Sequence, residues 1–317
     1  MILVTGATGH VGGELVRRLA ASGEPVRAMT RRPREARFPA GVEPVYGDAA
    51  DPASLAAAFA GTSAAFLMSA QPVGTAAAPT HDLALAEAAR EAGVRRLVKL
   101  SVLDGGGTGG DGDGDRYGGG DGDGDRYGGG DGDGGSDNDG DPIVRWHAAA
   151  EAAIVDRFPA WTLLRPGRFM SNALQWAPQL RAGDEVAIPF ADRPAASIDP
   201  ADLAEIAALA LTTDEHAGLT YELSGPESLT PAEELSLLGH ALSRDLRVRP
   251  VPPEAARAGM ERYGFPPDVV DAILHHTLDD DRGTEVLPTV AKVLGRPART
   301  FTQWAGAHTE AFRPGDR

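Results

Sequence analysis

"MILVTGATGHVGGELV", residues 1–16, decides the fold of this chain. A short apolar run leads into glycines at positions 6, 9 and 12, and a helical pattern follows. In a dinucleotide-binding turn the first glycine allows a tight bend, the second lets a pyrophosphate approach the backbone, and the third lets the helix pack closely on the strand. We therefore expect Gly6, Gly9 and Gly12 to hold a pyrophosphate at the amino end of the helix, where unpaired N–H groups and the helix dipole favour an anion. A plain glycine-rich turn is the alternative interpretation.

The rest of the chain alternates between strand-like and helix-like segments. This alternation is typical of an α/β fold, a doubly wound parallel sheet with helices on both faces. The predicted strands are 1–5, 25–30, 43–46, 63–69, 95–102, 160–164, 185–189 and 219–223, and the predicted helices are 11–22, 53–60, 80–92, 144–157, 201–211 and 231–242. We expect a dinucleotide-binding core over residues 1–165. We expect residues 166–317 to form a smaller, mostly helical substrate-side lobe that also contributes to the sheet edge.

A low-complexity segment at 105–141 interrupts this pattern. "GGDGDGDRYG" stands at 109–118 and again at 119–128, and a degraded third copy follows. Such a segment has almost no apolar side chains to bury, so we interpret it as a flexible, solvated insertion. A weak cation site is the alternative, although the spacing fails the EF-hand pattern, because the required glycine and the final glutamate are replaced by Arg116 and Gly122.

Composition narrows the class of protein. The chain has 317 residues, no cysteine and a net charge of −16. The insertion holds eleven aspartates and two arginines, so the remaining residues carry only −7. We expect no direct nucleic-acid binding, no membrane span, no signal peptide and no cysteine-ligated metal, and therefore a cytoplasmic protein with a small-molecule substrate. His275 and His276, with the acids at 279–281, fit a surface cluster better than a metal site, so no metal is expected. The sequence does not indicate an oligomeric state.

The end of the second predicted strand bears on the choice of dinucleotide. It is "AMTRRP", with Arg31 and Arg32 where an NAD-preferring site would carry an acid for the ribose 2′-hydroxyl. A guanidinium suits a 2′-phosphate through paired, charge-assisted hydrogen bonds. The sequence thus favours NADPH as cofactor, with NAD possible; in the alternative, both arginines are ordinary surface charges.

The chain resembles the NmrA-like branch of the atypical short-chain dehydrogenases/reductases. The resemblance covers nearly all of it outside 105–141. The segments that carry the resemblance are "VTGATGHVGGELVRRL", "LVKLS", "WHAAAEAAI", "TLLRPGRFMSN", "IDPADLAEIAALAL" and "YELSGPESLTPAEEL". Members of the branch include NAD(P)H-dependent quinone reductases, other reductases, and proteins that bind the dinucleotide without turning it over.

The resemblance implies a set of contacts. The loop from Gly6 to Val11 would hold the pyrophosphate, with Thr8 and His10 among its side chains. Arg31 would meet the adenosine phosphate. The remaining implied positions are Asp48 and Ala49 by the adenine; Ser69, Ala70, Gln71, Ser101 and Val102 on the nicotinamide side; and the turn 165–172, with Phe169, Met170 and Asn172 facing the substrate.

The chain departs from the wider superfamily in its acid–base residues. Typical members use Tyr-x-x-x-Lys, but neither of the two lysines here follows a tyrosine at that spacing. The equivalent helix carries His147-x-x-x-Glu151, one helical turn apart. His147 could act as a proton donor with Glu151 holding its imidazole, or the two could form a polar pair that transfers no proton.

Two functions follow from these patterns. The first is an NADPH-dependent oxidoreductase that transfers hydride to a small quinone-like or conjugated carbonyl acceptor; solvent could supply the proton, so the missing tyrosine and lysine do not forbid reduction. The alternative is a non-catalytic, NAD(P)-sensing regulatory protein that acts through a protein partner.

Overall fold

The computed structural model describes residues 1–68, 71–103, 141–278 and 281–313. Of the predicted insertion at 105–141, only Asp141 belongs to these residues.

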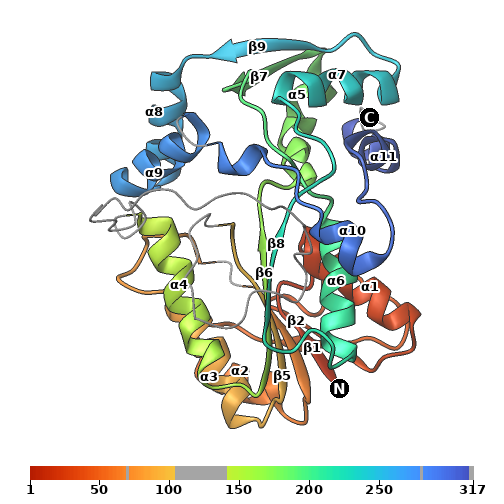
Figure 1. Cartoon of the computed structure of the whole chain (residues 1–317), viewed down its shortest axis with the longest axis vertical. Helices are drawn as coiled ribbons and strands as arrows, with labels where there is room; N and C mark the ends of the chain where they lie inside the picture. Colours follow the sequence, from red (N-terminus) through yellow and green to blue (C-terminus); the bar gives the residue numbers. More distant parts are fainter. Residues whose placement is uncertain (69–70, 104–140, 279–280, 314–317) are drawn as a thin grey trace, which may run out of the picture.

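A seven-stranded sheet, parallel throughout, forms the centre of the structure (Figure 1). Its strand order is β3-β2-β1-β4-β5-β6-β8, which confirms the predicted doubly wound sheet. The strands are β1 (Ile2–Val4), β2 (Val26–Thr30), β3 (Glu43–Tyr46), β4 (Ala64–Leu67), β5 (Arg96–Leu100), β6 (Ala160–Pro166) and β8 (Leu219–Leu223). The strand order reverses between β1 and β4, and ligands of such sheets bind at this switch point, beyond the carboxyl ends of the strands.

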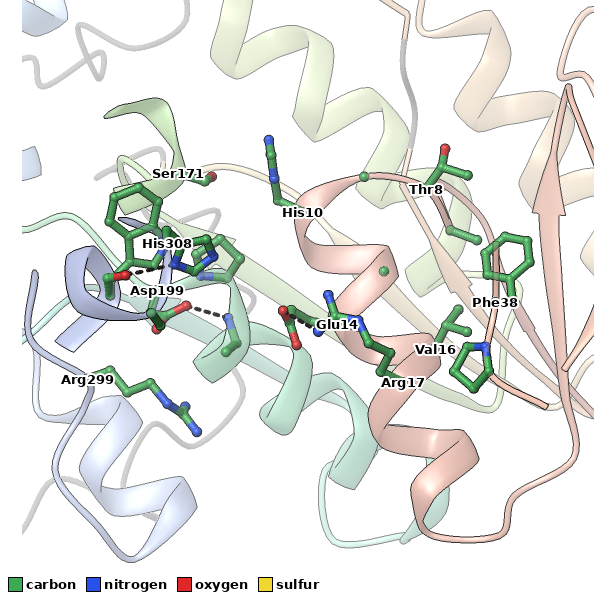
Figure 2. Close-up of a pocket in the computed structure, with 18 of the residues that line it drawn as sticks. Thr8, His10, Glu14, Val16, Arg17, Phe38, Ser171, Asp199, Arg299 and His308 are labelled. Atoms are coloured by element: carbon green, nitrogen blue, oxygen red, sulfur yellow. Dashed lines mark hydrogen bonds and ion pairs between the residues drawn. The ribbon is translucent and has the colours of Figure 1, made fainter. Parts of the chain in front are cut away.

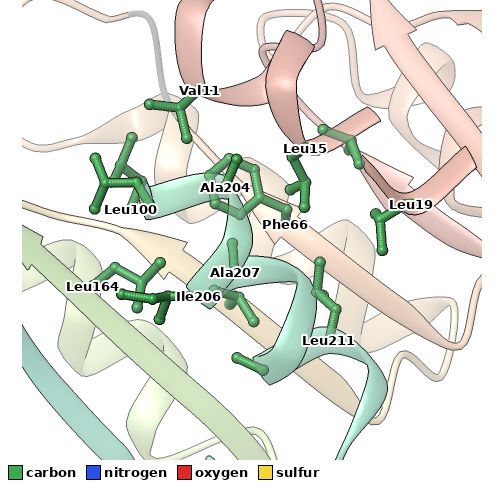
Figure 3. Packing of buried hydrophobic residues seen from close by; sticks show 14 of the residues in the cluster. Val11, Leu15, Leu19, Phe66, Leu100, Leu164, Ala204, Ile206, Ala207 and Leu211 are labelled. Carbon is green, nitrogen blue, oxygen red and sulfur yellow. The ribbon is translucent and has the colours of Figure 1, made fainter. Parts of the chain in front are cut away.

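Two layers of helices cover the sheet, one on each face. The first layer contains α1 (His10–Ala21) and α6 (Pro200–Thr212), with α10 (Thr289–Leu294) beside them; the second contains α2 (Pro52–Phe59), α3 (Thr80–Glu91) and α4 (Pro142–Val155). In Figure 3 Leu15 of α1 and Ala204 of α6 meet over Phe66 of β4. Successive residues of β1 point to opposite faces of the sheet. Ile2 and Val4 pack in the core under α1 and α6, and Leu3 packs in the core under α2, α3 and α4. The central strands are therefore buried on both faces and read as unbroken apolar runs.

Proline and a small polar cap start several of these helices. Asp51, Asp141 and Asp199 each accept hydrogen bonds from backbone N–H groups of the following turn, and a proline stands next to each at the first helical position. Thr230 does the same for α7 (Pro231–Leu242) in a reciprocal capping box with Glu233. Proline lacks a backbone N–H, but that group would have no helical partner at this position. These helices consequently begin one or two residues earlier than predicted, except α7, which begins where predicted.

The C-terminal lobe has its own apolar core. It combines the 3₁₀ helix η2 (Met170–Trp176), α5 (Ala177–Ala182), β7 (Glu185–Pro189), α7, α11 (Phe301–Ala307) and η4 (Thr309–Phe312). Further segments are α8 (Pro253–Tyr263), α9 (Pro267–Leu278) and the short η3 (Arg282–Thr284). Strand β9 (Arg247–Val251) pairs in parallel with β7 and is absent from the predicted elements. Its sequence, "RVRPV", is largely exposed and contains a proline, so it lacks the apolar alternation by which a strand is recognised. Among the described residues, no helix is long and apolar enough to cross a membrane.

Candidate functional site

The turn between β1 and α1 depends on two of its glycines. Gly6 has φ +59°, in the left-handed region that favours glycine. The turn is closed by a hydrogen bond from Gly9 N to Gly6 O at 2.9 Å. A Cβ on Gly12 would lie 2.2 Å from the carbonyl oxygen of Gly6, which is shorter than any real contact. Helix α1 can therefore approach the turn this closely only with glycine at position 12.

The amino end of α1 is open. Gly9 caps the helix without a side chain, no acidic residue stands in the first turn, and the first N–H groups lack a side-chain acceptor. The side chain of Val11 packs into the core, so this residue can offer a ligand only its backbone. Unpaired N–H groups at the positive end of a helix dipole form an anion site. A groove of about 990 Å³ crosses this end of the helix, with Thr8 and His10 on its wall (Figure 2).

A second cavity, of about 200 Å³, lies on the other side of Thr8, between the ends of β1, β2, β3 and β4. Its lining residues include five that were predicted from the sequence to bind the cofactor: Gly6, Thr8, Arg31, Asp48 and Ala49. Asp48 is held by the start of α2, because its N–H donates to Ser54 Oγ at 2.9 Å and its carboxylate accepts from Ala50 N at 3.0 Å. Gly47 precedes it, and a Cβ there would lie 2.5 Å from Met29. The cavity is of the size of an adenine ring and part of its ribose.

The two neighbouring arginines differ in placement. Arg31 lines the small cavity, whereas Arg32 is not among the residues that line it. The side chain of Arg32 is 78% exposed, and its Nη1 lies 3.6 Å from Glu35 Oε2. Arg37, farther along the same connection, lines the large groove. Of these guanidinium groups, Arg31 is the one beside the predicted ribose position.

A buried polar layer lies at the carboxyl end of β5. Lys99 Nζ is 3.0 Å from Asp82 Oδ1 of α3, and both side chains are almost fully buried. Two residues further, on the same face of the sheet, Ser101 is 4% exposed, and its Oγ has no hydrogen-bond partner among the described residues. The backbone of Ser101 is fixed by a 2.7 Å hydrogen bond from its N–H to Leu164 O. A buried hydroxyl without a described partner at the carboxyl end of a strand is a group that a ligand could satisfy.

His147 and Glu151 of α4 face the same layer but do not bond to each other. Glu151 accepts from Arg165 of β6 with both oxygens, at 3.0 and 2.5 Å, in a pair that is almost fully buried. His147 Nδ1 is buried and lacks a hydrogen-bond partner among the residues described. Burial and then the charge of Lys99 lower the pKa of His147 to about 4, so the imidazole is neutral at pH 7. Glu151 thus positions Arg165, and His147 faces the site as a neutral hydrogen-bonding group.

The remaining predicted residues differ in burial. Ser69 and Ala70 lie outside the described residues. Gln71 Oε1 accepts from His81 N at 3.0 Å at the start of α3, and Val102 is half-buried after β5. In the turn after β6, Phe169 is half-buried, Asn172 is exposed, and Met170 is 2% exposed within the core of the lobe.

Three residues of this site were not predicted from the sequence: Lys99, Asp82 and His81. His81 lines the small cavity. Lys99 was considered only for a tyrosine four residues before it, although it stands inside a strand that was predicted correctly, "RLVKL". A lysine flanked by apolar residues in a central strand must have a buried partner. That signal could have directed attention to an acid on a neighbouring helix.

Comparison with known proteins places these features in a family. A family model described as NAD(P)H-binding matches residues 6–117. The chain is 38% identical to the (4-alkanoyl-5-oxo-2,5-dihydrofuran-3-yl)methyl phosphate reductase of Streptomyces griseus, over 99% of this chain and 100% of that protein. The chain belongs to the NmrA-like family of atypical short-chain dehydrogenases/reductases. It is also 32% identical to the NAD(P)H azoreductase of Xenophilus azovorans, over 98% of this chain and 99% of the relative.

A solved structure shares the fold. It is that of an NADPH-dependent quinone oxidoreductase from Escherichia coli complexed with NADPH. Its TM-score to this chain is 0.68 at 23% identity, with 97% of this chain and 99% of the other covered. Because the relatives that it matches over nearly its full length are reductases, and because it carries the NAD(P)H-binding domain, the chain is an NAD(P)H-dependent oxidoreductase that binds NADP(H).

Proposed function

We propose that the chain transfers a hydride from NADPH to a small, electron-poor conjugated acceptor, quinone-like or with a conjugated carbonyl group. The observation that carries this proposal is the buried polar layer at the carboxyl end of β5, where Ser101 Oγ and His147 Nδ1 are both buried without a partner among the described residues. Buried polar atoms of this kind cost free energy unless a ligand satisfies them. They lie at the carboxyl ends of the strands. A dinucleotide with its adenosine in the small cavity would extend its nicotinamide along this end of the sheet.

The relatives support this acceptor class. The Streptomyces enzyme is named for reducing an unsaturated lactone, and the Xenophilus enzyme for reducing azo compounds. Both groups contain an electron-poor double bond, C=C conjugated with a carbonyl in the lactone and N=N in the azo compound, that can accept hydride. Both relatives are enzymes, which favours catalysis over the non-catalytic sensing role.

In the proposed mechanism the backbone N–H groups at the start of α1 bind the pyrophosphate and Arg31 binds the 2′-phosphate. NADPH, when bound, supplies the hydride. Ser101 Oγ donates a hydrogen bond to the nicotinamide amide or to the acceptor carbonyl, and Phe169 and Asn172 border the acceptor. His147 is neutral at pH 7 and serves as a hydrogen-bonding group, so the proton that completes reduction comes from solvent. Lys99 and Arg165 hold this layer in place from beneath.

The test is a direct assay of turnover. Purified protein is mixed with NADPH or NADH and a panel of quinones, unsaturated lactones, enones and azo compounds, and absorbance at 340 nm is followed. We expect oxidation with a conjugated acceptor and a preference for NADPH. Tight NADPH binding with no oxidation by any acceptor of this panel would contradict the proposed acceptor class.

A further inference from the structure

A separate cavity of about 450 Å³ lies in the C-terminal lobe, away from the cofactor turn. It is bounded by η2 and α5, by the end of β7, by the start of α7 and by the residues around the end of α9. Apolar side chains such as Trp176, Ile188 and Phe190 form much of its wall. Its ionisable side chains are Arg168, Arg193, His276 and Asp281. A cavity that joins an apolar wall to two guanidinium groups suits a ligand with an apolar body and an anionic end.

Arg193 provides an unpaired cation at this cavity. It is exposed, and no ion pair or side-chain hydrogen bond joins it to any residue in the described part of the chain. Its loop is nevertheless fixed, because Arg193 N donates to Phe190 O at 3.1 Å and Ala195 N donates to Leu229 O at 2.9 Å. Phe190, which begins the loop, has φ +52°, a left-handed conformation that is costly for a bulky residue. Strain of this kind concentrates at binding sites.

Arg168 provides a second cation, oriented by a buried acid. Its guanidinium donates to Glu234 Oε2 at 2.7 Å, and Ser197 Oγ donates to Glu234 Oε1 at 2.8 Å. Glu234 is 1% exposed, so Arg168 cannot easily turn away from it. Within the described part of the chain the guanidinium makes this one side-chain hydrogen bond, and Arg168 lines the cavity. Its other N–H groups are therefore left to bind a ligand. Because Arg168 is paired with Glu234, Asp281 is the remaining acidic side chain at the cavity among the described residues.

Two segments of the chain connect this cavity with the proposed hydride-transfer site. Arg168 is the immediate neighbour of Phe169, which borders the proposed acceptor position. On the other side, His276 Nε2 lies 2.5 Å from Asp141 Oδ2, and Asp141 caps α4. His147 follows six residues later in α4, which is about 9 Å along the helix axis. A ligand of moderate length could therefore extend from one site to the other.

We propose that this cavity is an anion subsite for the acceptor. It binds the phosphate or carboxylate end of an amphiphilic substrate through Arg193 and Arg168, while the conjugated end of the same molecule meets the nicotinamide. The alkyl part lies against Trp176, Ile188 and Phe190. This inference rests on the proposed function, since it names the class of acceptor that the same enzyme reduces.

Binding can be measured apart from turnover. The NADP⁺-loaded protein is titrated by calorimetry with octyl phosphate, octanoate and octanol. We expect at least one anion to bind about tenfold or more tightly than octanol, and Arg193→Ala to abolish this difference. The two anions distinguish a phosphate subsite from a carboxylate subsite. Arg247→Ala is the matched control, because it removes an exposed arginine of the same lobe that pairs with exposed Asp245. Equal binding of octanol and both anions, or anion binding unchanged in Arg193→Ala, would overturn the subsite.

Turnover provides the second measurement. Two acceptors with the same conjugated ring system, one bearing an alkyl phosphate and one an alkyl alcohol, are compared in the same assay. We expect Arg193→Ala to raise KM about tenfold for the phosphate-bearing acceptor, and to leave KM for the alcohol and both kcat values unchanged. If neither acceptor is reduced, the proposed hydride transfer fails while calorimetry still decides the subsite. If both acceptors are reduced with equal KM, and Arg193→Ala changes neither KM value, the subsite fails and the proposed function stands.

Discussion

Lys99 and Asp82 form an ion pair that joins the central strand β5 to helix α3 beneath Ser101, whose hydroxyl has no hydrogen-bond partner in the described part of the chain. The distance from Lys99 Nζ to Asp82 Oδ1 is 3.0 Å, and both side chains are at least 96% buried. Lys99 Nζ also donates to Leu100 O at 2.5 Å. Because the lysine is held from two sides, its charge remains next to His147, where it contributes to the lowered pKa of that imidazole.

Replacing one member of this pair should destabilise the protein strongly. Lys99→Met leaves the carboxylate of Asp82 buried without its partner, which costs about 3–5 kcal/mol. The double variant Lys99→Met/Asp82→Leu should lose much less, because no charge remains in the interior. Urea unfolding of the three proteins measures this difference. Arg247→Met, at an exposed pair, should leave the unfolding midpoint unchanged. A double variant as unstable as the single one would contradict the pairing.

The largely buried imidazole of His147 should make stability depend on pH. Its pKa is lowered from 6.5 to about 4, chiefly by burial. Between these two values the unfolded chain binds a proton that the folded protein does not, so stability rises with pH from about 4 to 6.5 and is lost as pH falls through this window. The contribution is about 3 kcal/mol. His147→Gln should reduce this dependence, as measured by urea unfolding at pH 5 and pH 7.5.

NMR provides an independent check on the same residue. The Hε1 resonance of His147, assigned by comparison with His147→Gln, should begin to shift only near pH 4 in the folded protein. His147 should also contribute no ionisation near pH 6.5 to the pH profile of kcat/KM. The profiles of the parent protein and of His147→Gln should therefore agree in that range. A resonance that titrates near 6.5 would restore His147 as a candidate proton donor.

The sheet could be predicted from the sequence because each strand and the glycine turn are specified by residues close together in the chain. The strands carry apolar runs, and Gly6 and Gly12 are required by contacts within one turn. The partners of buried charges could not be predicted in the same way. Glu151 was paired with His147 because they are one helical turn apart, yet it binds Arg165 on β6. That contact depends on how α4 packs against the sheet, and a sequence spacing within one helix contains no information about it. Strand β9 was missed for a related reason, since only its pairing with β7 makes it a strand.

Arg31 should select the phosphorylated cofactor. It lines the small cavity beside Asp48, while Arg32 is exposed near Glu35. Arg31→Ala should raise the Kd of NADPH about tenfold to a hundredfold, because charge-assisted hydrogen bonds to the 2′-phosphate are lost, and should leave the Kd of NADH unchanged. Arg32→Ala is the matched control and should change neither value appreciably. Fluorescence titration with both nucleotides measures all four constants; equal effects of the two variants would argue against a specific role for Arg31.

Gly12 should be irreplaceable at the cofactor turn. A Cβ at this position would lie 2.2 Å from Gly6 O and 2.7 Å from Gly6 C, which are backbone atoms and cannot rotate away. Gly12→Ala must therefore push α1 away from the turn, at a cost of about 3 kcal/mol or more, and widen the spacing of the N–H groups that receive the pyrophosphate. Gly259→Ala in α8 is the control, because nothing lies within 4 Å of the added Cβ and alanine favours a helix. We expect a slightly raised unfolding midpoint for Gly259→Ala, and a lowered midpoint with weakened NADPH binding for Gly12→Ala. If Gly12→Ala kept both properties of the parent protein, the close approach of α1 to the turn would not be what shapes the phosphate site.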